Sequence, residues 1–207
     1  MSAIVKEIKE QIITYARIME ECGMANTYEG NISAKYKNKI YITPSKIRKA
    51  MLTEAVIAEL DLDGNQIGGE KKASSESLMH TEAYKMRSDI NSVIHSHPTF
   101  LTAYALRRQP VVTKAYPEHI VVFKEIPVVD YGRPSTSSMI VDKEKTLYSY
   151  DIVLLASHGV LTVGENLPDT FALLEAAEAI AKVLSITALM GGEVPLAKDE
   201  YDYLYSL

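Results

Sequence analysis

The stretch SVIHSHPTF (92–100) joins a short apolar run, two histidines and a proline. The apolar run predicts a strand over 92–97, and Pro98 predicts the first turn of a following helix. Alternate residues of a strand point to one face, about 6.5 to 7 Å apart, and a residue before proline favours extended dihedrals. His95 and His97 are therefore expected to converge at a strand end, where two neutral imidazoles can bind one metal ion.

Short apolar pieces and helical periodicities surround this stretch on both sides. Turn signals between the short pieces favour hairpins and hence antiparallel pairing. The sequence predicts an α/β fold, a single three-layer α/β/α domain over 1–207 with a central, mostly antiparallel sheet and a Tyr-rich tail at about 197–207. Helices are expected over about 2–22, 75–87, 98–107, 137–150 and 168–191, and strands over 31–36, 39–43, 56–61, 121–123, 126–130, 151–156 and 159–163.

The composition limits the classes of partner and the compartment. The 207 residues include 22 Lys and Arg against 27 Asp and Glu, a formal net charge of −5 without a block of like charge. This balance argues against nonspecific binding to nucleic acid or to an anionic membrane. The single cysteine, Cys22, excludes an intrachain disulfide and fits a cytoplasmic location. No stretch approaches the about 20 apolar residues of a membrane span, and the charged N-terminus differs from a signal peptide.

A third metal ligand is needed to complete a site around the paired histidines. His158 is the strongest candidate, because it stands between two apolar runs in LLASHGVLTV (154–163) and immediately before a glycine. Gly159 permits a tight turn or a close backbone approach at this point. His80 lies within a predicted helix and is expected to be a structural hydrogen-bond partner, and His119 is expected at the surface.

Glu76 follows two serines in KASSESLMH (72–80) and shares a helix face with apolar residues. A carboxylate that points inward is costly unless it meets a cation, a metal ion or a hydrogen-bond donor. A helix N-terminus with free hydroxyl groups, here those of Ser74 and Ser75, is also an anion site. These features can serve a phosphate and a metal ion together, with further small polar groups at Gly30-Asn31 and Thr43-Pro44-Ser45.

Taken together, these motifs resemble the class II aldolase/adducin family. Each motif alone is common, but their order and spacing match that family across most of the chain. The matching elements are Gly30-Asn31-Ile32-Ser33, Thr43-Pro44-Ser45, Ser74-Ser75-Glu76, His95-Ser96-His97-Pro98, Tyr116 and His158-Gly159.

The resemblance implies a metal-dependent aldolase that cleaves a (deoxy)ketose 1-phosphate similar to L-fuculose 1-phosphate. It implies one Zn²⁺ per chain held by His95, His97 and His158. Glu76 is implied both as a resting metal ligand and as the catalytic base, and Tyr116 as the acid for the aldehyde-derived oxygen. The phosphate is implied to bind groups of Gly30, Asn31, Ser45, Ser74 and Ser75.

The same resemblance implies a homotetramer with active sites at the subunit interfaces. A C-terminal tyrosine closes over the site in such aldolases, and Tyr201, Tyr203 and Tyr205 are the candidates here. Two positions depart from the family pattern. Lys46 replaces a common glycine, and its charge can assist phosphate binding, while Glu29 stands where small residues are usual.

Several alternatives stay open from the sequence. The superfamily includes a pentulose-phosphate 4-epimerase, which carries aspartate where this chain has Glu76, and methylthioribulose-1-phosphate dehydratase, for which Glu118 is the candidate base. A non-catalytic adducin-like module would lack the zinc histidines. A structural zinc site would have a closed shell of four ligands. A Schiff-base aldolase would need a desolvated lysine, and no lysine lies in a clearly buried apolar run.

Overall fold

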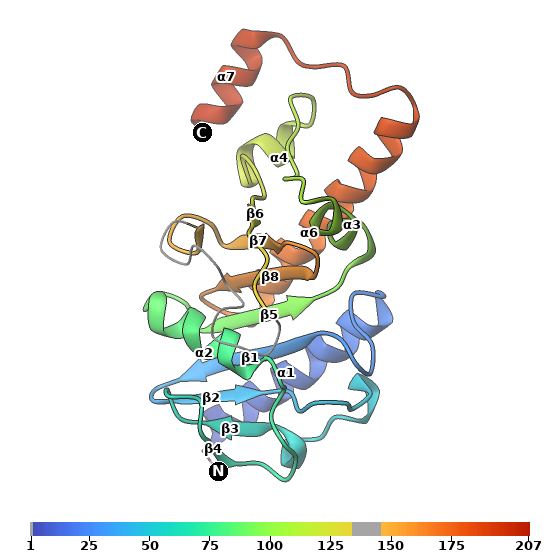
Figure 1. Cartoon of the computed structure of the whole chain (residues 1–207). Helices are drawn as coiled ribbons and strands as arrows, with labels where there is room; N and C mark the ends of the chain where they lie inside the picture. Colours follow the sequence, from blue (N-terminus) through green and yellow to red (C-terminus); the bar gives the residue numbers. More distant parts are fainter. Residues whose placement is uncertain (1, 134–145) are drawn as a thin grey trace.

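The computed structural model describes residues 2–133 and 146–207. Their strands form one sheet in the order β4-β3-β2-β1-β5-β8-β7-β6, which Figure 1 shows from bottom to top. Every neighbouring pair is antiparallel except β6 with β7. The strands are β1 (Asn31–Tyr36), β2 (Lys39–Ile42), β3 (Ala58–Leu60), β4 (Gln66–Gly68), β5 (Ser92–Ser96), β6 (Val128–Val129), β7 (Ile152–Leu155) and β8 (Gly159–Gly164).

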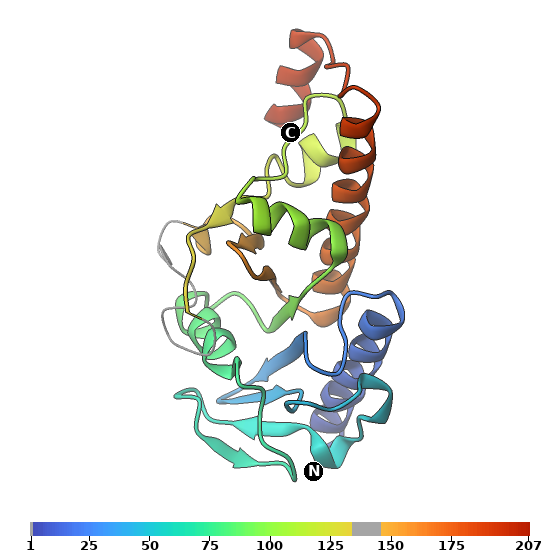
Figure 2. The same cartoon turned by 45° about the vertical axis from the view of Figure 1, so that its right-hand side comes forward.

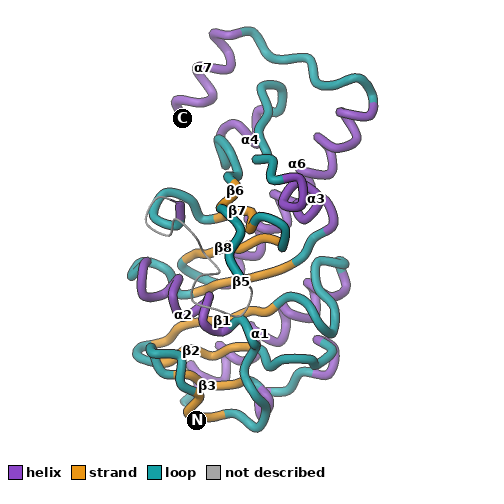
Figure 3. The backbone as a smooth tube through the Cα atoms, viewed as in Figure 1, coloured by secondary structure: helices purple, strands orange, loops and turns teal. Residues whose placement is uncertain are grey.

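Helices cover both faces of the sheet, as Figure 3 shows. Figure 2 shows α1 and α6 on one face and α2 on the opposite face. No helix of the described part is long and apolar enough to cross a membrane. The helices are α1 (Ala3–Glu21), α2 (Ser77–Met86), α3 (Thr99–Arg107), α4 (Pro117–Val122), α6 (Leu167–Leu189) and α7 (Lys198–Ser206), with short 3-10 helices η1 (Lys49–Met51) and η2 (Glu54–Val56).

The apolar residues of the central strands alternate between two cores. Ile94 packs with α1, α3 and α6, whereas its neighbour Val93 packs with α2 on the other face. Leu154 and Val153 of β7 divide in the same way. This alternation follows from the two-residue period of a strand, and it requires a layer of helices on each side. The expected α/β/α layers with a mostly antiparallel sheet are therefore confirmed.

Some element predictions were wrong in detail. Residues 121–123, expected as a strand, belong to the end of α4, because Pro117 in the first turn of that helix starts a helical segment instead. Pro98 is the N-cap of α3 rather than its first residue. The Tyr-rich tail forms α7, which packs beside α4. The helix expected over 137–150 falls mostly outside the described residues.

The β7–β8 turn brings distant parts of the sequence together. Ser157 adopts a left-handed conformation in this turn, with φ of 59°, and β8 then pairs with β5 in the register Ser96 with Val160. A Cβ atom built on Gly159 would lie 2.6 Å from the backbone oxygen of Ser96. Only glycine allows the two backbones to approach so closely, and the approach delivers His158 to the end of β5.

Candidate metal centre

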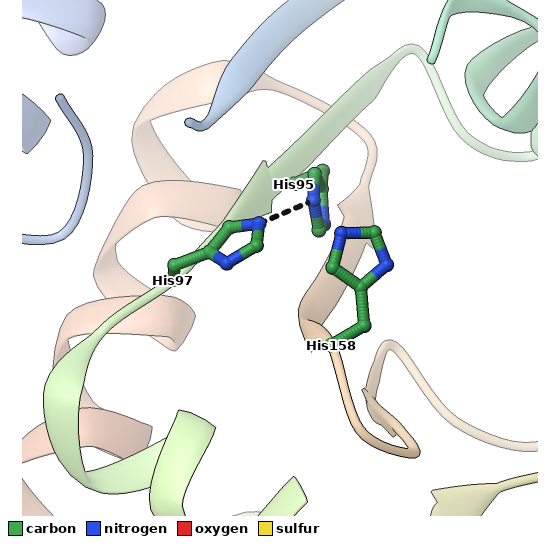
Figure 4. A group of neighbouring side chains, drawn as sticks. All are labelled: His95, His97 and His158. Carbon is green, nitrogen blue, oxygen red and sulfur yellow. Dashed lines mark hydrogen bonds between the residues drawn. The ribbon is translucent and has the colours of Figure 1, made fainter. Parts of the chain in front are cut away.

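Three histidines converge at the end of β5. His95 lies in β5, His97 follows that strand, and His158 lies in the β7–β8 turn. One ring nitrogen from each side chain lies within 4.8 Å of the others, and the Nε2 atoms of His95 and His97 are 2.9 Å apart. Figure 4 shows the three rings turned toward a common point. The structure thus brings together the three histidines that the sequence predicted as metal ligands.

The ring nitrogens are in the chemical state that a metal ion requires. His95 Nδ1 is 2.8 Å from the carbonyl oxygen of Val160. A carbonyl oxygen accepts hydrogen bonds but cannot donate one. The proton is therefore on Nδ1, and the Nε2 lone pair faces the cluster. Burial, followed by the positive potential of His95 and His158, lowers the pKa of His97 to about 4. Burial also lowers the pKa of His95, so both imidazoles are neutral ligands at pH 7.

The Glu76 carboxylate lies beside this cluster. Its side chain is only 14% exposed, and its two oxygens are each 3.3 Å from an Nε2 atom, one of His95 and one of His158. Asn31 Nδ2 donates a 2.8 Å hydrogen bond to it. Burial alone would raise the pKa of Glu76, but these three partners outweigh burial and hold the pKa well below its ordinary value. Three imidazoles and a carboxylate form a donor set that fits a divalent ion such as Zn²⁺.

A buried hydrogen-bond chain holds Asn31 in place behind the carboxylate. His80 Nε2 bonds the Oδ1 atom of Asn31, and His80 Nδ1 is 2.7 Å from the hydroxyl of Ser33, which in turn contacts Tyr84. Burial lowers the pKa of His80 to about 3, so the neutral ring donates to Asn31 and accepts from Ser33. The expected structural role of His80 is confirmed, and the amide of Asn31 orients Glu76.

A cavity of about 570 Å³ opens beside the metal cluster. A sealed structural zinc shell would leave no such space. Lys49 is almost fully buried in its wall, burial lowers the pKa of its ammonium, and the sequence reasoning missed this lysine. The cavity is lined by the predicted site residues Gly30, Asn31, Ser45, Lys46, Ser74, Ser75, Glu76, His97 and His158, by Glu29 and Pro44 next to two of the motifs, and by the unexpected Thr27, Tyr28, Lys49, Lys71 and Lys72.

Two cavity residues have left-handed backbone conformations. Gly30 has φ of 79°, and a Cβ there would lie 2.7 Å from the Cβ of Ala25, so glycine is required. Lys46 has φ of 55°, a conformation that glycine adopts without strain. In this chain a long cationic side chain takes that place despite the backbone cost.

Tyr116 lies away from the metal cavity of its own chain. It is the N-cap of α4 and lines a separate groove of about 330 Å³ at the C-terminal end of α6. Its neighbour Glu118 is absent from the residues that line the metal cavity. His119 is fully buried, so its expected surface position was wrong, and its Nε2 atom contacts the carbonyl of Val111.

The C-terminal segment is attached to the loop before Tyr116. Glu193 accepts hydrogen bonds from the Thr113 hydroxyl and from the backbone N–H of Lys114 at 2.8 Å. The N–H of Leu196 donates to the carbonyl of Lys114 at 2.8 Å. Tyr201 and Tyr205 of α7 line grooves in this region and not the metal cavity. The Tyr116 loop and the tail thus form one connected region.

Comparison with known proteins agrees with this fold and site. Residues 10–185 match the Class II Aldolase and Adducin N-terminal domain family. An L-fuculose phosphate aldolase of Methanocaldococcus jannaschii is 32% identical over 182 residues, covering 88% of this chain and 98% of that protein. A 5-methylthioribulose-1-phosphate/5-deoxyribulose-1-phosphate aldolase of Escherichia coli O45:K1 is 28% identical over 193 residues, covering 93% and 90%.

A solved structure of an L-fuculose 1-phosphate aldolase superimposes with a TM-score of 0.87 at 30% identity, covering 100% of this chain and 96% of that one. This chain therefore belongs to the class II aldolase and adducin family. Its cluster of His95, His97 and His158 is the kind of divalent metal site that metal-dependent enzymes of this family use.

Removing one imidazole is expected to abolish tight metal binding. We predict that His97→Ala lowers bound zinc from one ion per chain to well below half, as measured by elemental analysis after dialysis. His119→Gln is the matched control, because His119 is buried but lies outside the cavity. One retained zinc ion per chain in His97→Ala would contradict the ligand set.

The close backbone approach at Gly159 is expected to be as important for metal binding as the three histidines. We predict that Gly159→Ala weakens zinc affinity about 10- to 100-fold and lowers the free energy of unfolding by about 1–3 kcal/mol. The new Cβ meets backbone and two imidazole rings, which cannot move independently. Gly23→Ala, with open space around its Cβ, should keep its zinc affinity in the same titration. Equal affinities for both variants would refute this role.

Proposed function

We propose that the protein is a zinc-dependent aldolase that cleaves a (deoxy)ketose 1-phosphate, similar to L-fuculose 1-phosphate, into dihydroxyacetone phosphate and an aldehyde. The observation that carries the proposal is one open cavity that is lined by His97 and His158 of the three-histidine cluster, by Glu76, and by small polar and cationic side chains suited to an anion. The two relatives named above, both sugar-phosphate aldolases, support the substrate class.

The reaction breaks the C3–C4 bond of the ketose and requires two proton movements. A divalent ion held by the three histidines supplies Lewis-acid stabilisation of the charge that develops on the ketone oxygen. The C4 hydroxyl loses its proton as the aldehyde forms, and C3 gains a proton. We assign the exchange at C3 to Glu76, because its carboxylate lies at the cluster and is ionised there, which is the form that removes this proton in the synthetic direction.

The exchange at the aldehyde-derived oxygen is assigned to Tyr116, and this assignment requires a second subunit. Tyr116 lies outside the cavity of its own chain. The nearby end of α6 and the segment after it expose large apolar side chains, with Leu189 89%, Met190 81% and Val194 86% exposed. Such a surface is typical of an interface between subunits. We therefore propose a homotetramer in which each Tyr116 completes a neighbour's site, with a tail tyrosine beside it.

The alternatives are weaker on specific grounds. Glu76 stands where the epimerase has aspartate, and the dehydratase, whose candidate base is Glu118, is separated from the aldolase by the paired glutamate variants described below. An adducin-like module would not need three convergent imidazoles. The buried Lys49 is the candidate for a Schiff base, but its Nζ donates to the carbonyl of Asn26 at 2.9 Å. The cytoplasmic location stays a prediction.

A panel of ketose 1-phosphates tests the function, with released dihydroxyacetone phosphate as the readout. L-Fuculose 1-phosphate and 5-deoxyribulose 1-phosphate should be cleaved. Epimerisation of ribulose 5-phosphate and dehydration of methylthioribulose 1-phosphate, each followed by its own product, serve as the epimerase and dehydratase controls. A chelator should remove the activity and zinc should restore it. Borohydride trapping of substrate on the protein, or turnover of the two controls alone, would reject the proposal.

Glu76→Gln should bind zinc but lose cleavage. We predict a fall in kcat of roughly 10²- to 10⁴-fold, because the amide cannot exchange a proton with C3. Glu118→Gln is the matched control and should keep the wild-type rate, whereas the dehydratase alternative predicts the reverse pattern. Wild-type turnover by Glu76→Gln would reject its assignment as the base.

Mixed oligomers test whether Tyr116 acts in a neighbour's site. Tyr116→Phe and Glu76→Gln should each be nearly inactive alone. When the two are co-expressed with different tags and purified together, about a quarter of the shared sites regain both groups if subunits mix randomly in a ring. We therefore predict recovery of a corresponding part of the activity. No recovery in a mixed oligomer would show that each site uses its own Tyr116.

A further inference from the structure

Lysines outnumber glutamates in the lining of the metal cavity, although the chain as a whole carries a formal charge of −5. Four lysines line it: Lys46, Lys49, Lys71 and Lys72. Lys46, Lys71 and Lys72 are exposed, and within the described residues none of their ammonium groups has an ion pair or a hydrogen bond. Lys49 differs, because it is buried and donates to a backbone carbonyl. Three unpaired cations thus face one cavity.

The three cations come from two segments that lie side by side. An isolated antiparallel bridge joins Pro44 to Ala73, and the N–H of Ser45 donates to the carbonyl of Lys72 at 3.2 Å. On one segment Lys46 follows Ser45 directly. On the other segment Lys71 and Lys72 directly precede Ala73. The three lysines therefore flank the place where the two segments pair. The left-handed backbone of Lys46 places a charged side chain at a turn where glycine would be less strained.

The neutral groups expected to bind phosphate are partly engaged within the chain. The hydroxyl of Ser45 donates to the carbonyl of Ala73 at 3.3 Å and accepts from the N–H of Ser75 at 2.9 Å. The hydroxyl of Ser74 accepts from the N–H of Glu76 at 3.3 Å and keeps its own proton for a ligand. These bonds shape the turn at the start of α2, and they occupy the hydroxyl proton of Ser45 and the N–H groups of Ser75 and Glu76.

The amide of Asn31 is also engaged at both ends, by Glu76 and by His80. A phosphate dianion needs several donors, and hydrogen bonds in which the donor is charged are about twice as strong as neutral ones. The unpaired ammonium groups are therefore the strongest available donors for an anion in this cavity.

We propose that the ammonium groups of Lys46, Lys71 and Lys72 are ligands of the substrate's phosphate, and that each of them contributes more to its binding than a serine hydroxyl does. This inference rests on the proposed function, which supplies a phosphorylated substrate. It makes affinity depend on the charge of the phosphate, and because exposed charges are screened by salt, binding weakens steeply as ionic strength rises.

The test compares two ligands that differ only by the phosphate. Calorimetry measures the Kd of dihydroxyacetone phosphate and of dihydroxyacetone on the zinc-loaded protein, and separately the Kd of inorganic phosphate. We predict that Lys46→Met, Lys71→Met and Lys72→Met each weaken dihydroxyacetone phosphate binding about 3- to 10-fold. The triple variant should lose about 100-fold and most of the salt dependence, while dihydroxyacetone binding stays unchanged.

Two controls make the outcome decisive. Lys6→Met removes one charge from the exposed face of α1, outside the cavity, and should not change either Kd. Ser75→Ala should weaken dihydroxyacetone phosphate binding less than any of the three lysine variants. Lysine variants that match Lys6→Met, or a Ser75→Ala loss larger than theirs, would overturn the inference.

Inorganic phosphate separates this inference from the proposed function. If neither dihydroxyacetone nor its phosphate binds the zinc-loaded protein, the proposed function fails. The lysine site would still be supported if the three variants weaken binding of inorganic phosphate. If dihydroxyacetone phosphate binds and is released by the aldolase, but the lysine variants bind both anions normally, the lysine site alone is refuted.

Discussion

The site depends on a single close contact between two backbones, that of Gly159 with the carbonyl of Ser96. The β5–β8 pairing could tolerate a side chain at most positions, but not where an added Cβ would lie 2.6 Å from that oxygen. Because the contact is so short, the β7–β8 turn lies directly over the end of β5, and His158 meets two histidines more than 60 positions earlier in the sequence. The convergence of the three histidines is thus a consequence of sheet geometry, which fixes where the β7–β8 turn lies.

Charge compensation explains why such a polar cluster is tolerated in a largely buried place. A buried carboxylate would normally take up a proton, but Glu76 is held ionised by His95, His158 and Asn31. Burial lowers the pKa of His95 and of His97, so these two imidazoles are neutral at pH 7. The donor set is therefore prepared for a cation before one arrives, and the hydrogen-bond chain through His80 removes the rotational freedom that Asn31 would otherwise have.

Short stretches of sequence were enough to predict most of the fold and the three candidate metal ligands. The period-two pattern around Val93 and Ile94, and glycine after His158, are encoded within a few residues, so they were predicted correctly. The burial of His119 was missed because it depends on how α4 packs against distant residues. Lys49, Lys71 and Lys72 were missed for the same reason: their loops become one wall only when the sheet has formed.

The two departures from the family pattern carry opposite charges and line the same cavity. Glu29 acts on His97 and opposes the lowering of its pKa by burial, so its negative charge lies near the metal cluster, as that of Glu76 does. Lys46 adds its positive charge to those of Lys71 and Lys72. If the proposed substrate binds in this cavity, its phosphate would be drawn toward the lysines and away from the two carboxylates. On that proposal, the two residues that look like exceptions in the sequence would share one physical role, namely to orient an anionic substrate.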